Sequence, residues 1–402
     1  MARLFKYRSM WLFAAGVGSV FVSAIGLALI LAFVWWPISA RANARESVAH
    51  ADEVLSRFKS DQVLSEAAPK HDVSLDEEYA NLLLAWGSCR SRISVKLDRI
   101  ADGGIESTWL PPVLDWSEMD ARFDSVAGFA YKLRGNTTGI RLGMQRTLTG
   151  EDFLQLERER ELLACVALRA QLLESHSPDV ARTYLLAALR VSQRRLLGET
   201  WREGREVAAI RAAIVQCALR SSVVVGVNGA ELARLCLETN VPSRPSSLAR
   251  LEGELESRRN WVESAAKQGN AAGTVDKFAS ELQSFCAALD EWHAALPSFQ
   301  DPVHSIGLLI SLMHLHGDRG SVFSLWSEAY SYACEQLCWR ALEALAMGST
   351  ALDEVAGTTF GPGWGGRIRL EGQLCTIELA GSEVITWAKK HHDPIEWTFS
   401  RR

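Results

Sequence analysis

An uncharged run of 32 residues, from Ser9 to Ala40, limits what the start of this chain can become. About 20 helical residues cross the roughly 30 Å hydrocarbon core of a bilayer, and backbone groups in lipid must bond within their own segment. The run is longer than the roughly 7–15 apolar residues of a cleavable signal peptide, although Ala42 and Ala44 form the A-x-A pattern of a cleavage site. The sequence therefore predicts a retained transmembrane helix over residues 9–40.

The charges that flank this run predict its orientation. Arg3, Lys6 and Arg8 precede it, and basic residues on a short flank favour the cytoplasmic side. We expect a cytoplasmic tail of residues 1–8, a single pass through the cell membrane, and residues 41–402 outside the cytoplasm. The tail is too short for a cytoplasmic domain, so residues 41–402 must carry the function.

The balance of charge in residues 41–402 argues against one class of partner. This part contains 40 Lys and Arg against 48 Asp and Glu, and a net negative surface is unsuited to nucleic acid. A local cluster of arginines is interleaved with Glu199, Glu203 and Glu206. We expect a solvated helix face on which these glutamates pair with the arginines. The cluster consists of Arg190, Arg194, Arg195, Arg202, Arg205 and Arg211.

The eight cysteines leave two alternatives open. An even number outside the cytoplasm permits four disulfide bridges, whereas apolar settings such as "LLACVAL" are typical of buried thiols. Cys334 and Cys338 lie four apart on one predicted helix face, which packing explains without a metal or redox role. The eight are Cys89, Cys165, Cys217, Cys236, Cys286, Cys334, Cys338 and Cys375.

Helix signals dominate most of residues 41–402. A polar amphipathic helix near 47–68 indicates a helical stalk over residues 41–70, and a helical domain follows over residues 71–356. We expect this domain to be a helical bundle or an irregular helical array. Its helices are predicted from the capping box at 74–77 to about 100, and near 118–134, 150–175, 178–197, 200–220, 229–239 and 246–268.

The clearest periodicity lies in residues 275–296. Apolar residues recur there alternately three and four positions apart, and such a seam pairs with another helix. We expect a partner within the chain, because many other amphipathic helices are available, although pairing across a dimer remains an alternative. The seam consists of Val275, Phe278, Leu282, Phe285, Leu289, Trp292 and Leu296.

The pattern changes in residues 357–402. Four short segments there alternate apolar and polar residues: 366–371, 373–379, 383–388 and 394–400. They predict a small antiparallel meander of three or four strands that packs on the helical domain. The predicted fold is therefore mainly α, with a single N-terminal transmembrane helix, an extracytoplasmic helical region and a small C-terminal antiparallel β meander (α+β overall).

Two short motifs could indicate a bound ligand, but their context argues against it. "GPGWGG" at 361–366 fits G-x-G-x-x-G, yet a dinucleotide loop must open a helix and a strand is predicted here. His314, His316 and Asp318 could bind a metal, but histidines two apart do not share a helix face. We therefore predict no catalytic, cofactor-binding or metal-binding residues and no cofactor.

One pair of segments resembles a known enzyme family. "GIESTWLPP" at 104–112 and "GIRLGMQRTLTG" at 139–150 resemble the E-S and G-L-M-Q segments of lytic transglycosylases, which cleave cell-wall glycan outside the cytoplasm. The resemblance implies that Glu106 is the general acid and base, with its pKa raised by burial.

The preferred functional hypothesis is an interaction or scaffold protein of the cell envelope. It is tethered to the lipid bilayer through residues 9–40 and binds protein partners or a second copy of itself. No enzymatic activity is evident, because no complete catalytic constellation occurs in the chain. The alternatives are an envelope hydrolase that uses Glu106 and an extracytoplasmic ligand-binding module.

Overall fold

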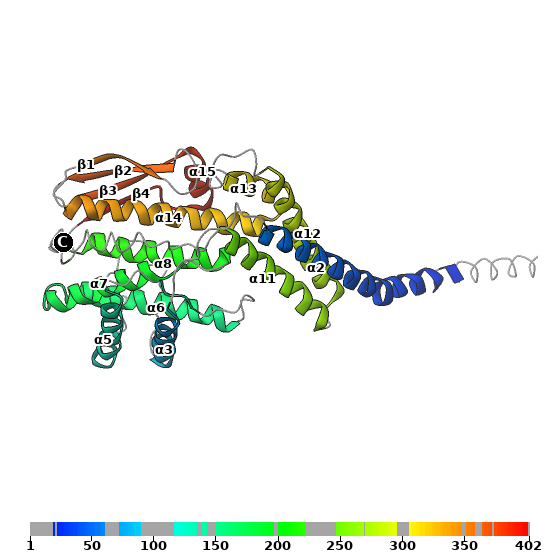
Figure 1. Cartoon of the computed structure of the whole chain (residues 1–402), viewed down its shortest axis with the longest axis horizontal. Coiled ribbons are helices and arrows are strands. Elements are labelled where there is room, and N and C mark those ends of the chain that lie inside the picture. The colour runs from blue at the N-terminus through cyan, green and yellow to red at the C-terminus, as the bar shows by residue number, and fades with distance from the viewer. Residues whose placement is uncertain are drawn as a thin grey trace, which may run out of the picture.

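The computed structural model shows a mostly helical protein with a small antiparallel sheet near the C-terminal end of the chain (Figure 1). This confirms the predicted combination of helices and a terminal sheet. A long helix extends away from the body towards the N-terminus. The structure describes residues 19–20, 22–60, 72–89, 116–134, 139–142, 150–196, 200–221, 223, 247–268, 270–295, 305–346, 351–357, 364–371 and 374–400.

The extended helix is long and apolar enough to cross a membrane. It spans Val22–Phe58, and the body buries none of its most apolar window. A π-helical turn, η1 (Leu31–Trp35), joins residues 22–30 to α2 (Trp36–Ser60). Pro37 has no N–H with which to continue the α-helical bonding, and the Trp36 N–H bonds to the Leu31 carbonyl five residues back. The helix nevertheless continues without a break into the body.

The predicted stalk, residues 41–70, is described as far as Ser60, and this part lies against the body. The α2 helix packs on α11 (Ser247–Lys267) and α12 (Ala272–Ala295). Its small residues Ala40 and Ala44 are buried, which allows α12 to approach closely. The internal partner expected for the 275–296 seam is therefore α2.

These helices enclose what we call the proximal core, which α13 (Ser305–Leu315) completes. The seam residues Val275, Leu282, Phe285 and Leu289 are buried in it. It also includes Ala40, Ala44, Ala51, Val54, Leu55, Phe58, Trp201, Leu251, Leu255, Val262, Cys286, Trp292, Leu309, Met313 and Leu325.

The second apolar cluster, the distal core, lies in the remaining helices and the sheet. Two long helices, α8 and α14, run side by side, with α6 and α7 on one side of them and the sheet on the other (Figure 1). The Thr200 side chain accepts a hydrogen bond from the Glu203 N–H and caps α8. The helices are α3 (Val73–Cys89), α5 (Trp116–Lys132), α6 (Gly150–Leu173), α7 (Pro178–Arg194), α8 (Trp201–Arg220) and α14 (Arg319–Ala346).

The sheet pairs its strands in the order in which they occur in the chain, and every neighbouring pair is antiparallel. On the face towards α14, Ile368 lies opposite Ile377 and both are buried. Gly366 permits this close packing, because a Cβ there would lie 2.6 Å from the Glu378 carbonyl oxygen and from Leu337. The strands are β1 (Ala351–Gly357), β2 (Trp364–Glu371), β3 (Leu374–Ala380) and β4 (Glu396–Ser400).

One predicted strand is wrong, and one strand was not predicted, because β1 lies almost entirely within residues 71–356, where a helical domain is expected. Residues 383–388 belong to a helix, α15 (Ser382–His391), which lies between β3 and β4. The apolar residues of this segment fit helical spacing as well as alternation, and Trp387 and Ala388 are buried together. Basic side chains in the last turn of α15 also favour the helix through its dipole.

The expected solvated face is wrong for four of the six arginines, whereas Arg202 is exposed and Arg205 is half-buried. Arg194, Arg195 and Arg211 are only 2%, 1% and 2% exposed, and Arg190 is buried too. Arg195 lies 3.1 Å from a Glu159 oxygen and 2.9 Å from a Glu203 oxygen, both of which are buried. Of the three predicted glutamate partners, Glu203 pairs with Arg195 and Glu206 with Arg205, while Glu199 lies outside the described residues. The other buried partners come from distant helices.

Candidate functional site

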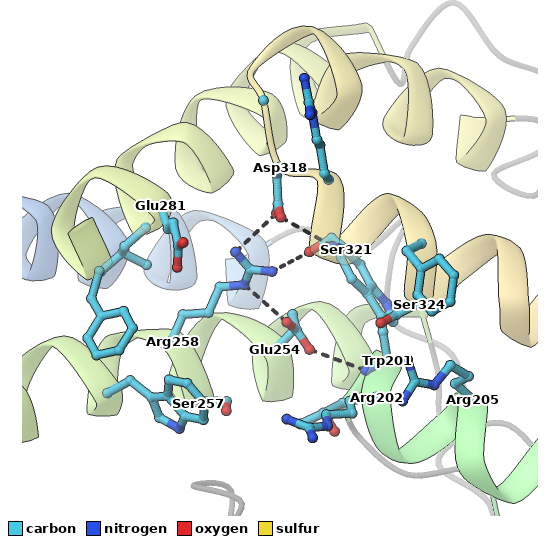
Figure 2. A pocket seen from close by; sticks show the side chains of 18 residues that line it. Trp201, Arg202, Arg205, Glu254, Ser257, Arg258, Glu281, Asp318, Ser321 and Ser324 are labelled. Atoms are coloured by element: carbon cyan, nitrogen blue, oxygen red, sulfur yellow. Dashed lines mark hydrogen bonds and ion pairs between the residues drawn. The ribbon is translucent and has the colours of Figure 1, made fainter. Parts of the chain in front are cut away.

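A cavity of about 540 Å³ opens beside the proximal core, whose residues Trp201 and Leu282 line it. Four elements line it: the start of α8, the middle of α11, part of α12, and the turn that leads from α13 into α14 (Figure 2). We call it the arginine pocket, because Arg202, Arg205, Arg258 and Arg319 all line it.

Two helices begin at the arginine pocket, and a carboxylate of the chain occupies each N-terminus. The Trp201 N–H of α8 donates to a Glu254 carboxylate oxygen at 3.2 Å. The Ser321 N–H of α14 donates to Asp318 Oδ1, also at 3.2 Å. Helix N-termini favour negative charge, so both carboxylates stabilise the helices that they cap.

Arg258 of α11 joins these two carboxylates. Its guanidinium lies 3.0 Å from Glu254 and 3.0 Å from Asp318, and it also donates to the Ser321 hydroxyl (Figure 2). Burial opposes the charge of Arg258, but Glu254 and Asp318 more than offset this effect and raise its pKa. One guanidinium therefore fixes the starts of α8 and α14 relative to α11.

The remaining groups of the pocket suit binding better than proton transfer. Glu281 and the hydroxyls of Ser257 and Ser324 complete its polar lining, with Trp261 and Phe278 as apolar wall. Among the described residues that line it there is no histidine, lysine or cysteine. Two of its three carboxylates are held by Arg258. The pocket can therefore hold polar or anionic groups through its arginines.

Glu106 cannot be placed, because residues 104–112 lie outside the described residues. Part of the second segment of that resemblance is described. Ile140 bonds through its backbone to the end of α7, with its N–H 2.7 Å from the Arg194 carbonyl oxygen and its own carbonyl 2.9 Å from the Leu196 nitrogen. Ile140 is completely buried, so this stretch belongs to the distal core.

The three potential metal ligands near the end of α13 do not converge. His316 Nε2 lies 2.9 Å from a Glu291 oxygen, Asp318 pairs with Arg258, and His314 lines a different cavity. In the described part of the chain, no three His, Cys, Asp or Glu side chains are grouped as metal ligands would be.

Six cysteines are buried and unbridged, which favours the packing alternative for them. They lie in the interior of helices and strand β3. Burial raises the pKa of Cys165 and of Cys286 to about 12 and that of Cys217 to about 11, so these thiols stay protonated at neutral pH. The Cys89 side chain and Cys236 lie outside the described residues. The six are Cys165, Cys217, Cys286, Cys334, Cys338 and Cys375.

The glycine-rich motif leads into a strand. Trp364 begins β2, and Gly366 is the residue that α14 packs against. Residues 361–363 lie outside the described residues.

No pattern in the sequence points directly to the arginine pocket. Its local elements can be read, because Thr200 and Glu203 form a capping pattern and Gly317-Asp318 precede a helix. Their convergence on Arg258 cannot be read in the same way, since it depends on how α8, α11 and the turn before α14 pack together, and these are separated in the chain.

No family model, curated protein or solved structure matches this chain. Its function must therefore be inferred from its own residues.

Proposed function

We propose that this chain is a membrane-tethered interaction protein whose anchor helix is part of its fold. The observation that carries this proposal is the continuity of the helix over Val22–Phe58. Its first part is apolar and exposed, while its second part is buried between α11 and α12. A helix of this kind joins the membrane to the body without a flexible linker.

Packing near the membrane end of α2 supports retention of the anchor. A cut after Ala44 would remove Ala40 and Ala44 from the proximal core, where both are buried. It would also remove Trp36, whose ring lies beside Gly273 at the start of α12. Cleavage would thus expose apolar surface of α12, which costs free energy. With the basic flank inside, the body lies on the extracytoplasmic side.

The chemistry of the arginine pocket supports binding rather than catalysis. A general acid or base must be free to exchange its proton with a substrate, whereas Glu254 and Asp318 are both paired with Arg258 and cap helices. Protein partners, or a second copy of the chain, are therefore the ligands that we propose for the body.

The mass and composition of the protein extracted from its native membrane in mild detergent test this proposal. We expect a complex in which a partner, or a second copy, is present in a fixed ratio and survives a wash at high salt. A chain that runs alone as a monomer under gentle extraction would contradict the proposal.

A further inference from the structure

A second cavity adjoins the arginine pocket. It has a volume of about 790 Å³, is open to solvent, and lies between α13, the start of α14 and the end of α15. Arg319 and Phe323 line both cavities, so the two are neighbours. We call it the aromatic groove; its main lining residues are His314, Arg319, Phe323, Trp326, Trp387 and Lys390.

Aromatic rings form one wall of the aromatic groove. The ring centroids of Phe323 and Trp387 are 6.0 Å apart, and the His391 ring lies 4.7 Å from that of Trp387 and 5.2 Å from that of Phe323. Phe323 is 40% exposed although it is a large apolar residue. A partly exposed ring such as Phe323, packed on a buried Trp387, is a typical anchor for a side chain of a binding partner.

The charged side chains of the aromatic groove are all basic or histidine. Arg319, Lys390 and two histidines line it, and no described Asp or Glu does. The chain as a whole has more acidic than basic residues. The lining of the aromatic groove therefore differs in charge from the chain as a whole. Charge complementarity selects a negatively charged ligand for such a surface.

The position of Arg319 cannot be explained by helix stability. Arg319 is the first residue of α14, where the helix dipole disfavours a positive charge. It is exposed, and no described carboxylate pairs with its side chain. Lys390, in the last turn of α15, is where the dipole favours a cation, and it too has no ionic partner in the described part of the chain. An unpaired cation in an unfavourable position is consistent with an anion that arrives from outside.

We infer that the aromatic groove docks an acidic segment of a partner protein. An aromatic or long apolar side chain of that segment packs against Phe323 and Trp387, and its carboxylates face Arg319 and Lys390. The open shape of the groove suits an extended segment, because small molecules are usually enclosed on most of their surface. The inference rests on the proposed interaction function and names the chemistry of the partner.

A library of random dodecapeptides, selected for binding to the full chain in detergent, tests this inference. We expect the selected peptides to be acidic and to contain at least one aromatic or large apolar residue. Arg319→Glu and Lys390→Glu should each weaken the binding of a selected peptide about tenfold, because each turns an attraction into a repulsion. Lys267→Glu is the matched control: it reverses an exposed charge at the end of α11, outside the groove, and should leave binding unchanged.

A loss of binding in Arg319→Glu would not be caused by unfolding of the chain. A glutamate at the first position of α14 agrees with the helix dipole, so this variant should unfold no more easily than the original chain. Selected peptides without acidic character, or equal binding by the variants, would overturn the inference. The inference would also fail if no peptide were selected and naphthalene-2-sulfonate bound to the groove. That result would indicate a site for a small organic anion.

The native complex separates the two proposals. If the double variant Arg319→Glu/Lys390→Glu still purifies with its partner, the partner docks elsewhere: this inference fails and the interaction function stands. If the unaltered chain purifies alone, the interaction function itself fails.

Discussion

The ion pairs that join α2 to the other helices of the proximal core lie near the surface, whereas the distal core has ion pairs in its interior. In the proximal core, the Arg259–Asp52 pair that joins α11 to α2 has side chains that are 29% and 51% exposed. In the distal core, the side chains of Arg211 and Glu335, which join α8 to α14, are 2% and 0% exposed. The same kind of pair therefore has a different energetic role in each core.

Burial determines this role. An exposed pair contributes about 0–1 kcal/mol, because water already solvates both charges. A buried pair gains little over an apolar pair of the same shape, yet loss of one member costs about 3–5 kcal/mol, since the other charge is left uncompensated. The distal core should therefore be sensitive to loss of a charge and the proximal core to loss of apolar volume.

Arg195→Leu should have the largest effect on stability. It leaves the buried carboxylates of Glu159 and Glu203 without their cation and should lower the free energy of unfolding by about 3–5 kcal/mol. Urea titration of the full chain in detergent, followed by tryptophan fluorescence, measures this.

The dependence on pH sharpens this prediction. Burial already raises the pKa of Glu203, and removal of Arg195 raises it further. A folded-state pKa above the unfolded value means that the folded state binds more protons, so stability falls as pH rises through that interval. The loss in Arg195→Leu should therefore be larger at pH 8 than at pH 5. Adding Glu159→Gln and Glu203→Gln should recover part of it, and a loss below about 1 kcal/mol at pH 8 would contradict the account.

Leu289→Ala should have the next largest effect. Leu289 is completely buried in the seam of α12, and the cavity left by this change should cost about 2–5 kcal/mol in the same titration. Unlike Arg195→Leu, this variant should show the same loss at pH 5 and pH 8. Leu84→Ala is its control, because Leu84 is 54% exposed on α3 and its truncation should change stability by less than about 0.5 kcal/mol. Equal losses in the two variants would mean that α12 is not packed as described.

Gly366→Ala should have a smaller effect, confined to the contact between the sheet and α14. The added methyl group would meet the Glu378 carbonyl and Leu337, and such overpacking costs about 1–3 kcal/mol. Faster hydrogen exchange of the β2 and β3 amides measures it. Gly128→Ala in α5 is the control with the opposite sign, because a Cβ there meets no atom within 4 Å and alanine favours a helix. Unchanged exchange in Gly366→Ala would show that the sheet lies further from α14.

Arg259→Ala should have the smallest effect. It removes the exposed pair with Asp52, whose atoms are 2.7 Å apart, and should lower the free energy of unfolding by less than about 1 kcal/mol. Added salt should reduce even this difference, because it screens exposed charges. A loss above about 2 kcal/mol, unaffected by salt, would make the proximal core as dependent on charge as the distal core.

The sequence predicted the proximal core better than the distal core, for a physical reason. The seam around Leu282 and Leu289 is a local pattern, and its period alone indicates a helix partner. The burial of Arg195 and Arg211 depends on their pairing with Glu159 and Glu335. These glutamates lie on α6 and α14, in distant parts of the chain. A local pattern of charges looks the same whether it lies on a surface or in a core.

The sheet and the two cavities show the same limit. Strands β2 and β3 were predicted from their alternation, but the segment of α15 fits both periods and was assigned wrongly. The arginine pocket and the aromatic groove depend on how α8, α11, α13, α14 and α15 meet. The sequence patterns single out only isolated residues of these sites, such as His314 and Asp318.

The intact mass of the mature protein, together with the fraction in which it is found, tests the central claim most directly. If the anchor helix is part of the fold, the protein in native membranes contains the region before Ala44 and leaves the bilayer only with detergent. The account predicts that the mature chain still contains the apolar part of the helix that begins at Val22. A soluble chain that begins at Arg45 would contradict it, because the proposed anchor helix would have been removed.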